Sequence, residues 1–284
     1  MKNIIKVTPK DRNEWLQIKR GTIGGSEIAA VCGLNKWFSP RDVWMLKTGK
    51  TEFAEPAMVM KRGSYLEDGF AQFWANEMGH RIIKSSKKDI LYIDKEHRFL
   101  SVTPDRTFFH RDGGKRTLEI KTTFSRAEEP EMSWITQLQW EMLFTGHQFG
   151  EIVWEYGDPR ICFKSQEFEA DKTMQQQLKE YAIYWWNEFV VKDIEPPAIN
   201  SNDILNKFPV EEEGKEIIAP DSIAEKYSYM KQLQVTIKEK EDELEGHKEQ
   251  VKMFMEDAEN LTYNGEKLFT WKANKKGTRV FYIK

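Results

Sequence analysis

A Pro-Asp pair and a Glu-Ile-Lys triplet, joined by one short hairpin, constrain the fold of this chain more than any other feature. Asp105 begins one strand-like segment and Glu119-Ile120-Lys121 lies in the next, with the turn-forming Asp112-Gly113-Gly114 between them. Because side chains alternate along a strand, Glu119 and Lys121 project from one face, while Ile120 points into the core. The turn folds Asp105 back to lie roughly opposite Glu119. The sequence therefore predicts two paired strands that bring two carboxylates and one ammonium group together.

Such a cluster has the composition of a divalent-metal site. Hydrolysis of a phosphodiester needs an activated water and neutralisation of charge on phosphate, and carboxylate-bound Mg²⁺ supplies both. Asp105 and Glu119 can share one ion, with the Ile120 backbone carbonyl as a third protein oxygen. The Lys121 ammonium would then orient or help deprotonate the attacking water. We therefore expect one or two Mg²⁺ ions, for which Mn²⁺ can substitute.

Helical and strand-like segments alternate around this hairpin. The pattern predicts a short helix capped by Ser26 after Gly24-Gly25, then a helix from Ser39-Pro40 to Gly49 and another over residues 60–78. Further predicted elements are a β-meander over residues 81–123, a helix over 134–144, strands over 150–156 and 161–168, and a helix over 171–191. This order predicts an α/β core, with a mixed central sheet flanked by helices.

The composition changes after residue 195, which predicts a boundary between two parts. We expect a core domain over residues 1–195, a linker rich in proline and acidic residues over 196–221, and an extension over 222–284. Ser222 and Glu225 form a capping-box pattern for a long helix, and two glycine turns indicate a small β-meander behind it. Residues 193–260 hold eight Lys/Arg against eighteen Asp/Glu, whereas residues 261–284 hold six against one.

Cysteine content and hydropathy limit the class of protein further. Only Cys32 and Cys162 are present, so one chain can build neither a disulfide framework nor a four-cysteine iron–sulfur site. No apolar run approaches the roughly 18 residues that span a bilayer, and residues 1–10 lack the apolar stretch of a secretory signal. We therefore expect a cytoplasmic protein, in the host cell's cytoplasm if a phage encodes it.

A set of motifs in a fixed order resembles the YqaJ-type phage recombinase exonucleases, relatives of lambda exonuclease in the PD-(D/E)xK nuclease superfamily. The resemblance covers about residues 12–192. The residues that carry it are Trp15, Lys19, Arg20, the segment from Ile23 to Ala30, Arg62-Gly63, Leu66-Glu67, Thr103-Pro104-Asp105, Leu118-Glu119-Ile120-Lys121 and Gln137-Leu138-Gln139.

The resemblance implies an activity that the spacing alone does not show. It implies a metal-dependent 5′-to-3′ exonuclease that digests one strand of linear double-stranded DNA and leaves a 3′ single strand for phage-type recombination. A single-strand annealing protein would be the partner, and the family's ring-shaped homotrimer would be the assembly. Glu67 would be an additional carboxylate that points toward the metals. Gln137 and Gln139 lie two apart on a helix and cannot share one face, and the family pattern favours Gln137 at the site.

The resemblance also implies a pocket for the 5′-phosphate of the digested strand. Its candidate residues are Lys19, Arg20 and Ser26, since Ser26 begins a helix whose free N–H groups favour an anion. Lys19 and Arg20 cannot be ranked from the sequence. For Ser26, a purely structural role as a helix cap is an almost equal alternative.

Other functions fit parts of the same pattern. A restriction-type endonuclease uses the same metal site, and a catalytically silent DNA-binding or assembly module would use the long helix and basic tail. The ten tryptophans could stack on bases. However, five of them fall at helical spacing and are predicted to be core residues: Trp44, Trp74, Trp140, Trp185 and Trp186.

Overall fold

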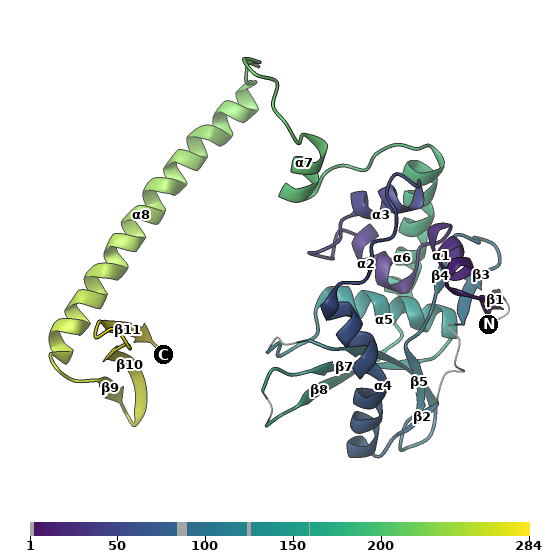
Figure 1. Ribbon diagram of the computed structural model, residues 1–284, viewed down its shortest axis with the longest axis horizontal. Helices are drawn as coiled ribbons and strands as arrows, with labels where there is room; N and C mark the ends of the chain where they lie inside the picture. Colours follow the sequence, from purple (N-terminus) through teal and green to yellow (C-terminus); the bar gives the residue numbers. More distant parts are fainter. Residues whose placement is uncertain (1–2, 84–89, 124–125, 159) are drawn as a thin grey trace. The chain divides into compact units, whose positions relative to one another are not determined.

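The chain folds into two compact units, Met1–Val210 and Glu211–Lys284, each of which is described by itself. The computed structural model describes residues 3–83, 90–123, 126–158 and 160–284 (Figure 1). Within these residues, no helix combines the length and the apolar character that crossing a lipid bilayer requires.

A five-stranded sheet forms the centre of the first unit, in the order β2-β5-β6-β7-β8. The strands are β2 (Arg81–Ile83), β5 (Arg106–Phe109), β6 (Lys115–Lys121), β7 (Phe149–Glu155) and β8 (Phe163–Glu169). The β6–β7 pair is parallel and the other three pairs are antiparallel, so the sheet is mixed. A parallel pair needs a crossover, and helix α5 (Met132–Thr145) provides it.

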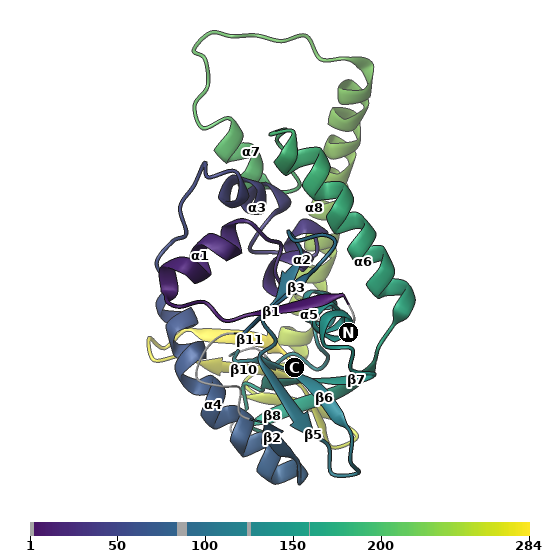
Figure 2. The ribbon, with the colours of Figure 1, turned by 90° about the vertical axis from the view of Figure 1, so that its right-hand side faces the viewer.

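Helices α4 (Met58–Met78) and α5 cover opposite faces of this sheet (Figure 2). In the β6–β7 register, Glu119 is paired with Ile152, and Ile120 with Val153. Ile120 and Val153 pack under Trp74 of α4, whereas Ile152 packs under α5. Glu119 therefore faces α5. The predicted α/β core with a mixed central sheet flanked by helices is confirmed.

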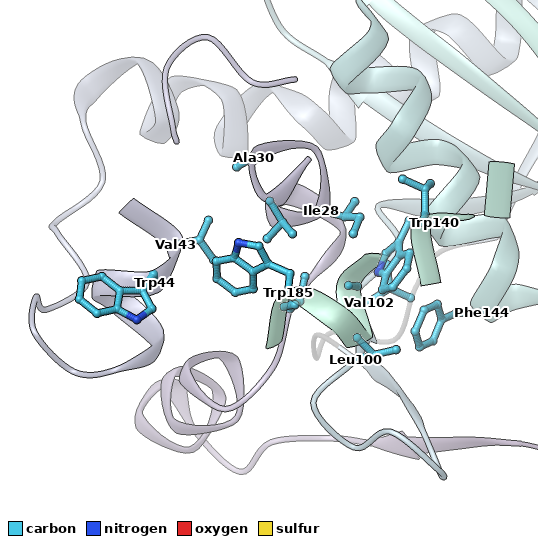
Figure 3. Close-up of a cluster of buried hydrophobic side chains, with 13 residues drawn as sticks. Ile28, Ala30, Val43, Trp44, Leu100, Val102, Trp140, Phe144 and Trp185 are labelled. Carbon is cyan, nitrogen blue, oxygen red and sulfur yellow. The ribbon is translucent and has the colours of Figure 1, made fainter. Parts of the chain in front are cut away.

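A second hydrophobic cluster lies among five helices and a small sheet of order β1-β3-β4 (Figure 3). The helices are α2 (Gly25–Val31), α3 (Pro40–Lys47), α5, α6 (Lys172–Trp185) and the π-helix η1 (Trp186–Val191), and the unit also contains α1 (Arg12–Arg20) and α7 (Ser201–Lys207). The strands are β1 (Ile4–Val7), β3 (Leu91–Asp94) and β4 (Ser101–Val102). The predicted core tryptophans Trp44, Trp74, Trp140 and Trp185 are buried, and Trp186 is half-buried and stacked on Phe99.

The second unit consists of a long helix and a small antiparallel sheet of order β11-β10-β9, as predicted. Its elements are α8 (Asp221–Met255), β9 (Asn260–Tyr263), β10 (Glu266–Ala273) and β11 (Arg279–Ile283). Arg279 ties this unit together, because its guanidinium lies 3.6 Å from the centroid of the Trp271 ring and donates to the carbonyl oxygens of Glu256 and Ala258.

Several local expectations were wrong or differ from the structure. The segment 81–123 is not one meander, because β3 and β4 lie outside the central sheet, in a small sheet where β3 pairs with β4 and with β1. Helix α8 begins at Asp221 behind Pro220, without a side-chain cap from Ser222. The expected linker 196–221 contains α7, which Asp203 anchors by accepting a 2.6 Å hydrogen bond from the Ser39 hydroxyl.

Gly150 on β7 lets α5 approach the sheet closely. A Cβ atom at this position would lie 2.8 Å from Leu138 Cδ1 and 2.8 Å from Met142 Sδ, both on α5. We expect Gly150→Ala to destabilise the fold by about 1–3 kcal/mol through overpacking, measured by denaturant unfolding. Gly69→Ala is the matched control, since open space surrounds Gly69 on α4 and alanine should raise helix stability there. Equal stability of the two variants would contradict this account of α5 packing.

Candidate active site

The β5–β6 hairpin places Asp105 beside Glu119. Arg106 is paired with Leu118, so the antiparallel register puts Asp105, the residue before β5, opposite Glu119. The carboxylate of Asp105 accepts a 3.0 Å hydrogen bond from the backbone N–H of Ile120. This bond fixes the Asp105 side chain across the end of β6, toward the face that carries Glu119.

Lys121, Glu119 and Gln137 form one hydrogen-bonded network between β6 and α5. The Lys121 ammonium lies 2.6 Å from Glu119 Oε1 and donates a 2.9 Å hydrogen bond to Gln137 Oε1. The Gln137 amide nitrogen donates a 2.9 Å hydrogen bond to Glu119 Oε2. The amide therefore has one orientation, with its oxygen toward the ammonium and its nitrogen toward the carboxylate.

Glu141 is a site residue that the sequence analysis missed. It lies one helical turn beyond Gln137, is completely buried, and accepts a 3.2 Å hydrogen bond from the Gln137 amide at Oε1. Its Oε2 is buried without a hydrogen-bond partner in the described part of the chain. Burial raises the pKa of Glu141 well above its usual value, and the charges of Glu119 and Asp105 raise it further. The spacing of Gln137 and Glu141 places both on one helical face, which was the available signal.

The same crowding of charge affects Asp105 and Lys121. Burial raises the pKa of Asp105 well above its usual value, and the neighbouring Glu119 and Glu67 add to the rise. For Lys121, burial alone would lower the pKa, but Glu119 and Asp105 outweigh it, so the pKa is raised. The lysine therefore stays charged, whereas the negative charges of the carboxyl groups repel one another, and one ammonium group does not balance them.

Glu67 reaches the same cavity from α4. The cavity is lined by residues of the network together with Gly63, Glu67 and Thr122. A Cβ atom on Gly63 would lie 2.9 Å from the Thr122 hydroxyl oxygen, so a glycine here allows α4 to approach the end of β6 closely. Arg106 holds the Glu67 carboxylate at 2.9 Å. Glu67 is thus at the edge of the cavity and paired with a cation.

Gln139 points away from the network, unlike Gln137. Its side-chain oxygen accepts hydrogen bonds from the Asp171 backbone and the Gln175 amide, and its nitrogen donates to the Glu169 carbonyl. These bonds tie α5 to the start of α6. Gln139 is therefore a structural residue, and of the two glutamines only Gln137 contacts Glu119 and Lys121.

The residues of this cavity fit a divalent cation. The carboxyl groups of Asp105, Glu119 and Glu67 line it together with Lys121. Next to Glu119, the buried Oε2 of Glu141 has no hydrogen-bond partner among the residues that the structure describes. Carboxylate oxygens are the ligands that Mg²⁺ and Mn²⁺ prefer. Asp105 and Glu119 could hold the ion. Ile120, whose backbone carbonyl the sequence suggested as a further ligand, also lines this cavity.

A second acidic cluster, Asp94 with Glu96 and His97, is better explained as a capped turn. Asp94 accepts 2.9 Å hydrogen bonds from the backbone N–H groups of Glu96 and His97, and Lys179 occupies its other oxygen at 2.8 Å. Burial alone would raise the pKa of Asp94, but these donors lower it. Both oxygens therefore already have partners within the protein.

The three phosphate candidates occupy different environments. A second cavity is lined by Lys19 and Ser26 and shares Asp105 and Gln137 with the network. Arg20 turns away from it, donating to the carbonyl oxygens of Leu46 and Thr51 and pairing with Glu52. The structure thus separates Lys19 from Arg20, which the sequence could not do.

Ser26 is not the cap of α2, contrary to the expectation. Gly24 is the N-cap residue, and its N–H donates a 2.9 Å hydrogen bond to the Glu27 carboxylate. Ser26 is exposed and lines the cavity.

A buried ion pair holds this segment in place. Lys47 of α3 lies 2.8 Å from Glu27 and donates a 2.7 Å hydrogen bond to the Lys19 carbonyl oxygen. Both side chains are almost inaccessible to solvent. Burial lowers the pKa of Lys47, although Glu27 acts against this change. The pair links α1, α2 and α3 behind Ser26, and sequence reasoning did not identify it.

Comparison with known proteins supports the resemblance of this domain to a recombinase family. Residues 14–148 match the family described as the YqaJ-like viral recombinase domain. The uncharacterized protein YqaJ of Bacillus subtilis (strain 168) is 28% identical over 212 residues, which cover 72% of this chain. The match spans 64% of the length of that relative. The resemblance to YqaJ-type recombinases is therefore confirmed.

Solved structures share the fold. The alkaline exonuclease LHK-Exo from Laribacter hongkongensis superposes with a TM-score of 0.51 at 21% identity, covering 64% of this chain and 94% of its own. LHK-Exo in complex with dAMP gives a TM-score of 0.50 at 19% identity over the same shares. At this identity the likeness concerns the fold of the first unit.

Proposed function

We propose that this protein is a Mg²⁺-dependent exonuclease of the PD-(D/E)xK superfamily that degrades one strand of linear double-stranded DNA from its 5′ end. It would act in the cytoplasm and leave 3′ single-stranded DNA for recombination. The convergence of Asp105, Glu119, Lys121 and Gln137 at one end of the sheet carries this proposal. The family match and the alkaline exonuclease among the structural neighbours support it.

The side chains can divide the work of phosphodiester hydrolysis. A bound divalent cation supplies charge neutralisation and a more acidic water. The raised pKa of Lys121 keeps an ammonium at the site, where it offsets charge on the scissile phosphate and orients the attacking water. Gln137 fixes that ammonium and the Glu119 carboxylate relative to each other. This pre-orientation reduces the reorganisation needed during reaction.

The direct test is digestion of linear duplex DNA labelled at either end, with Mg²⁺ and with EDTA. We expect early release of mononucleotides from labelled 5′ ends and no release in EDTA. Early release from 3′ ends would contradict the proposed direction, and metal-independent digestion would contradict the metal centre.

Closed circular DNA distinguishes the proposed exonuclease from a restriction-type endonuclease. A closed circular plasmid has no ends, so an exonuclease should leave it intact over times that consume linear DNA. Rapid cleavage of circles would favour the endonuclease. Failure of Mg²⁺ or Mn²⁺ to bind in calorimetric titration would favour a catalytically silent DNA-binding module.

Lys19 and Ser26 are proposed to bind the 5′-phosphate of the digested strand. Lys19 lines the cavity beside Asp105, so we expect Lys19→Ala to lower kcat/KM on 5′-phosphorylated ends by about 10–100-fold, as for loss of a charged hydrogen bond of ~1.5–3 kcal/mol. The loss should be much smaller on 5′-hydroxyl ends. Arg20→Ala is the matched control, because Arg20 binds protein groups instead and its removal should lower stability without changing end preference.

Assembly and partner binding are proposed from the family alone: a homotrimer and a single-strand annealing protein. Because α7 is anchored to α3, a deletion that tests the second unit should begin at Glu211. Loss of DNA affinity with a changed salt dependence would assign this unit to DNA binding. Unchanged digestion with lost binding of the annealing protein would assign it to docking.

A further inference from the structure

Trp37 differs from the other tryptophans of this chain in its exposure. All ten lie in the described residues, and Trp37 is the one that belongs to the exposed class, at 85%. Single exposed apolar side chains are common, so exposure alone has no functional meaning. The position and support of Trp37 give the exposure its significance.

Trp37 lies at the rim of the active-site network. It lines a hollow together with Lys121, Gln137 and Ser26, three residues that also line the cavity of the carboxylates. Thr122 and Trp134 complete part of the same wall. A DNA strand with its phosphate at Lys121 would therefore pass the Trp37 indole within the same depression.

Hydrogen bonds and hydrophobic packing fix the turn that carries Trp37. The Asn35 side chain accepts hydrogen bonds of 2.9 and 3.1 Å from the backbone N–H groups of Trp37 and Phe38. Phe38 packs against the hydrophobic cluster behind the turn. Lys36 pairs with Glu131 at 2.7 Å and lies 5.8 Å from the centroid of the Trp37 ring. The indole is thus presented by a fixed backbone, with a cation beside it.

We propose that Trp37 is a stacking platform for a nucleobase of the DNA strand near the phosphate that is cleaved. This inference rests on the proposed function, since it takes DNA as the ligand of the cavity. An aromatic ring recognises any base through its flat face and contributes about 1–3 kcal/mol per base. Trp37 would thereby bind DNA without sequence preference and align the strand beside Lys121.

Binding measurements test the proposal separately from catalysis. Fluorescence anisotropy with Asp105→Asn protein and Mg²⁺ keeps the DNA intact, on a duplex with an unpaired 5′ end. We expect Trp37→Ala to weaken binding about tenfold or more, whereas Trp37→Phe stays within about threefold. Because the side chain is exposed, Trp37→Ala should unfold at the same temperature as its parent.

Two controls identify stacking as the cause. DNA with an abasic nucleotide at one position near the end should bind the parent and Trp37→Ala equally, because the base that stacks is missing. Tyr184→Ala, which removes another exposed ring on α6, should have no effect. Lys36→Ala should lower the salt dependence of binding, whereas Trp37→Ala should not.

Unchanged affinity in Trp37→Ala, or an equal loss on every abasic DNA, would overturn the proposal. Its failure is distinguishable from failure of the nuclease function. Trp37-dependent DNA binding without any cleavage by the unmodified protein would reject the nuclease and retain the platform. Cleavage with binding that is independent of Trp37 would do the reverse.

Discussion

Asp105→Ala and Lys121→Ala should each abolish digestion of linear DNA, with a loss of about 10³-fold or more in rate. Asp105 supplies one of the carboxylates that could hold a cation, and Lys121 supplies the ammonium that we propose offsets charge on the phosphate. Charge stabilisation by a metal centre contributes several kcal/mol to a transition state, and each ~1.36 kcal/mol is a factor of ten. Single-turnover rates on end-labelled DNA measure the loss.

The folded state of these variants must be shown independently. Burial raises the pKa of Asp105, so the ionised carboxylate is unfavourable in the metal-free protein. In EDTA, Asp105→Ala should therefore lower the free energy of unfolding by no more than about 0.5–1.5 kcal/mol, which is the contribution of the lost hydrogen bond from the Ile120 N–H. Digestion at the unmodified rate by either variant would refute the assignment of the site.

Glu96→Ala is the control for the second acidic cluster. Glu96 is exposed and belongs to the capped turn at Asp94, so its removal should change neither the fold nor the rate of digestion. A large loss of activity in Glu96→Ala, with normal activity in Asp105→Ala, would move the metal centre to the Asp94 turn.

The hairpin that carries the site could be predicted because its determinants are local. The glycine turn and the alternation around Glu119 specify which strand partner Asp105 meets, and the observed register agrees. The separation of β3 and β4 from the central sheet could not be predicted in this way. It depends on β1, almost ninety positions earlier, whose residues Ile4 to Val7 pair with Leu91 to Asp94.

The roles of neighbouring polar residues also depend on distant partners. Lys19 and Arg20 are adjacent and carry the same charge, yet Arg20 is removed from the cavity by Glu52 and the carbonyl oxygens of residues 46 and 51. Ser26 is a residue type that often caps helices, but it lies inside α2, because Gly24 is the N-cap residue. The local sequence shows which roles a residue type can take, and the tertiary contacts determine which of those roles it has in the folded protein.

Glu141 illustrates this selection, because a glutamate in a helix is ordinarily a solvated residue. Here α5 lies over Glu119, so the carboxyl group of Glu141 is enclosed beside another carboxylate, and one of its oxygens has no hydrogen-bond partner within the described parts of the chain. Such a group lowers the stability of the fold. A role in the site would explain why this position holds a glutamate. Its contact with the Gln137 amide is the contact through which it can do so.

Glu141→Gln should therefore stabilise the metal-free protein. Glutamine keeps an oxygen for the Gln137 amide and has a donor in place of Oε2 without needing a bound proton, so the gain should be about 1–3 kcal/mol in EDTA once the pH exceeds the ordinary glutamate range. The raised pKa means that the folded protein holds a proton that the unfolded chain releases. Stability of the unmodified protein should thus fall as pH rises above the ordinary glutamate range, and the advantage of Glu141→Gln should grow with pH.

Glu141→Leu separates the hydrogen bond from simple packing. Leucine fills the space but cannot accept a hydrogen bond from the Gln137 amide, which would lose one of the three bonds that fix its orientation between Lys121 and Glu119. Removing such an outer partner of a metal site typically costs about 10–100-fold in metal affinity or activity. We expect that loss in Glu141→Leu for Mn²⁺ affinity by calorimetry and for digestion rate, with near-normal values in Glu141→Gln. If Glu141→Leu bound Mn²⁺ and digested DNA normally, Glu141 would be a buried acid with no part in positioning Gln137.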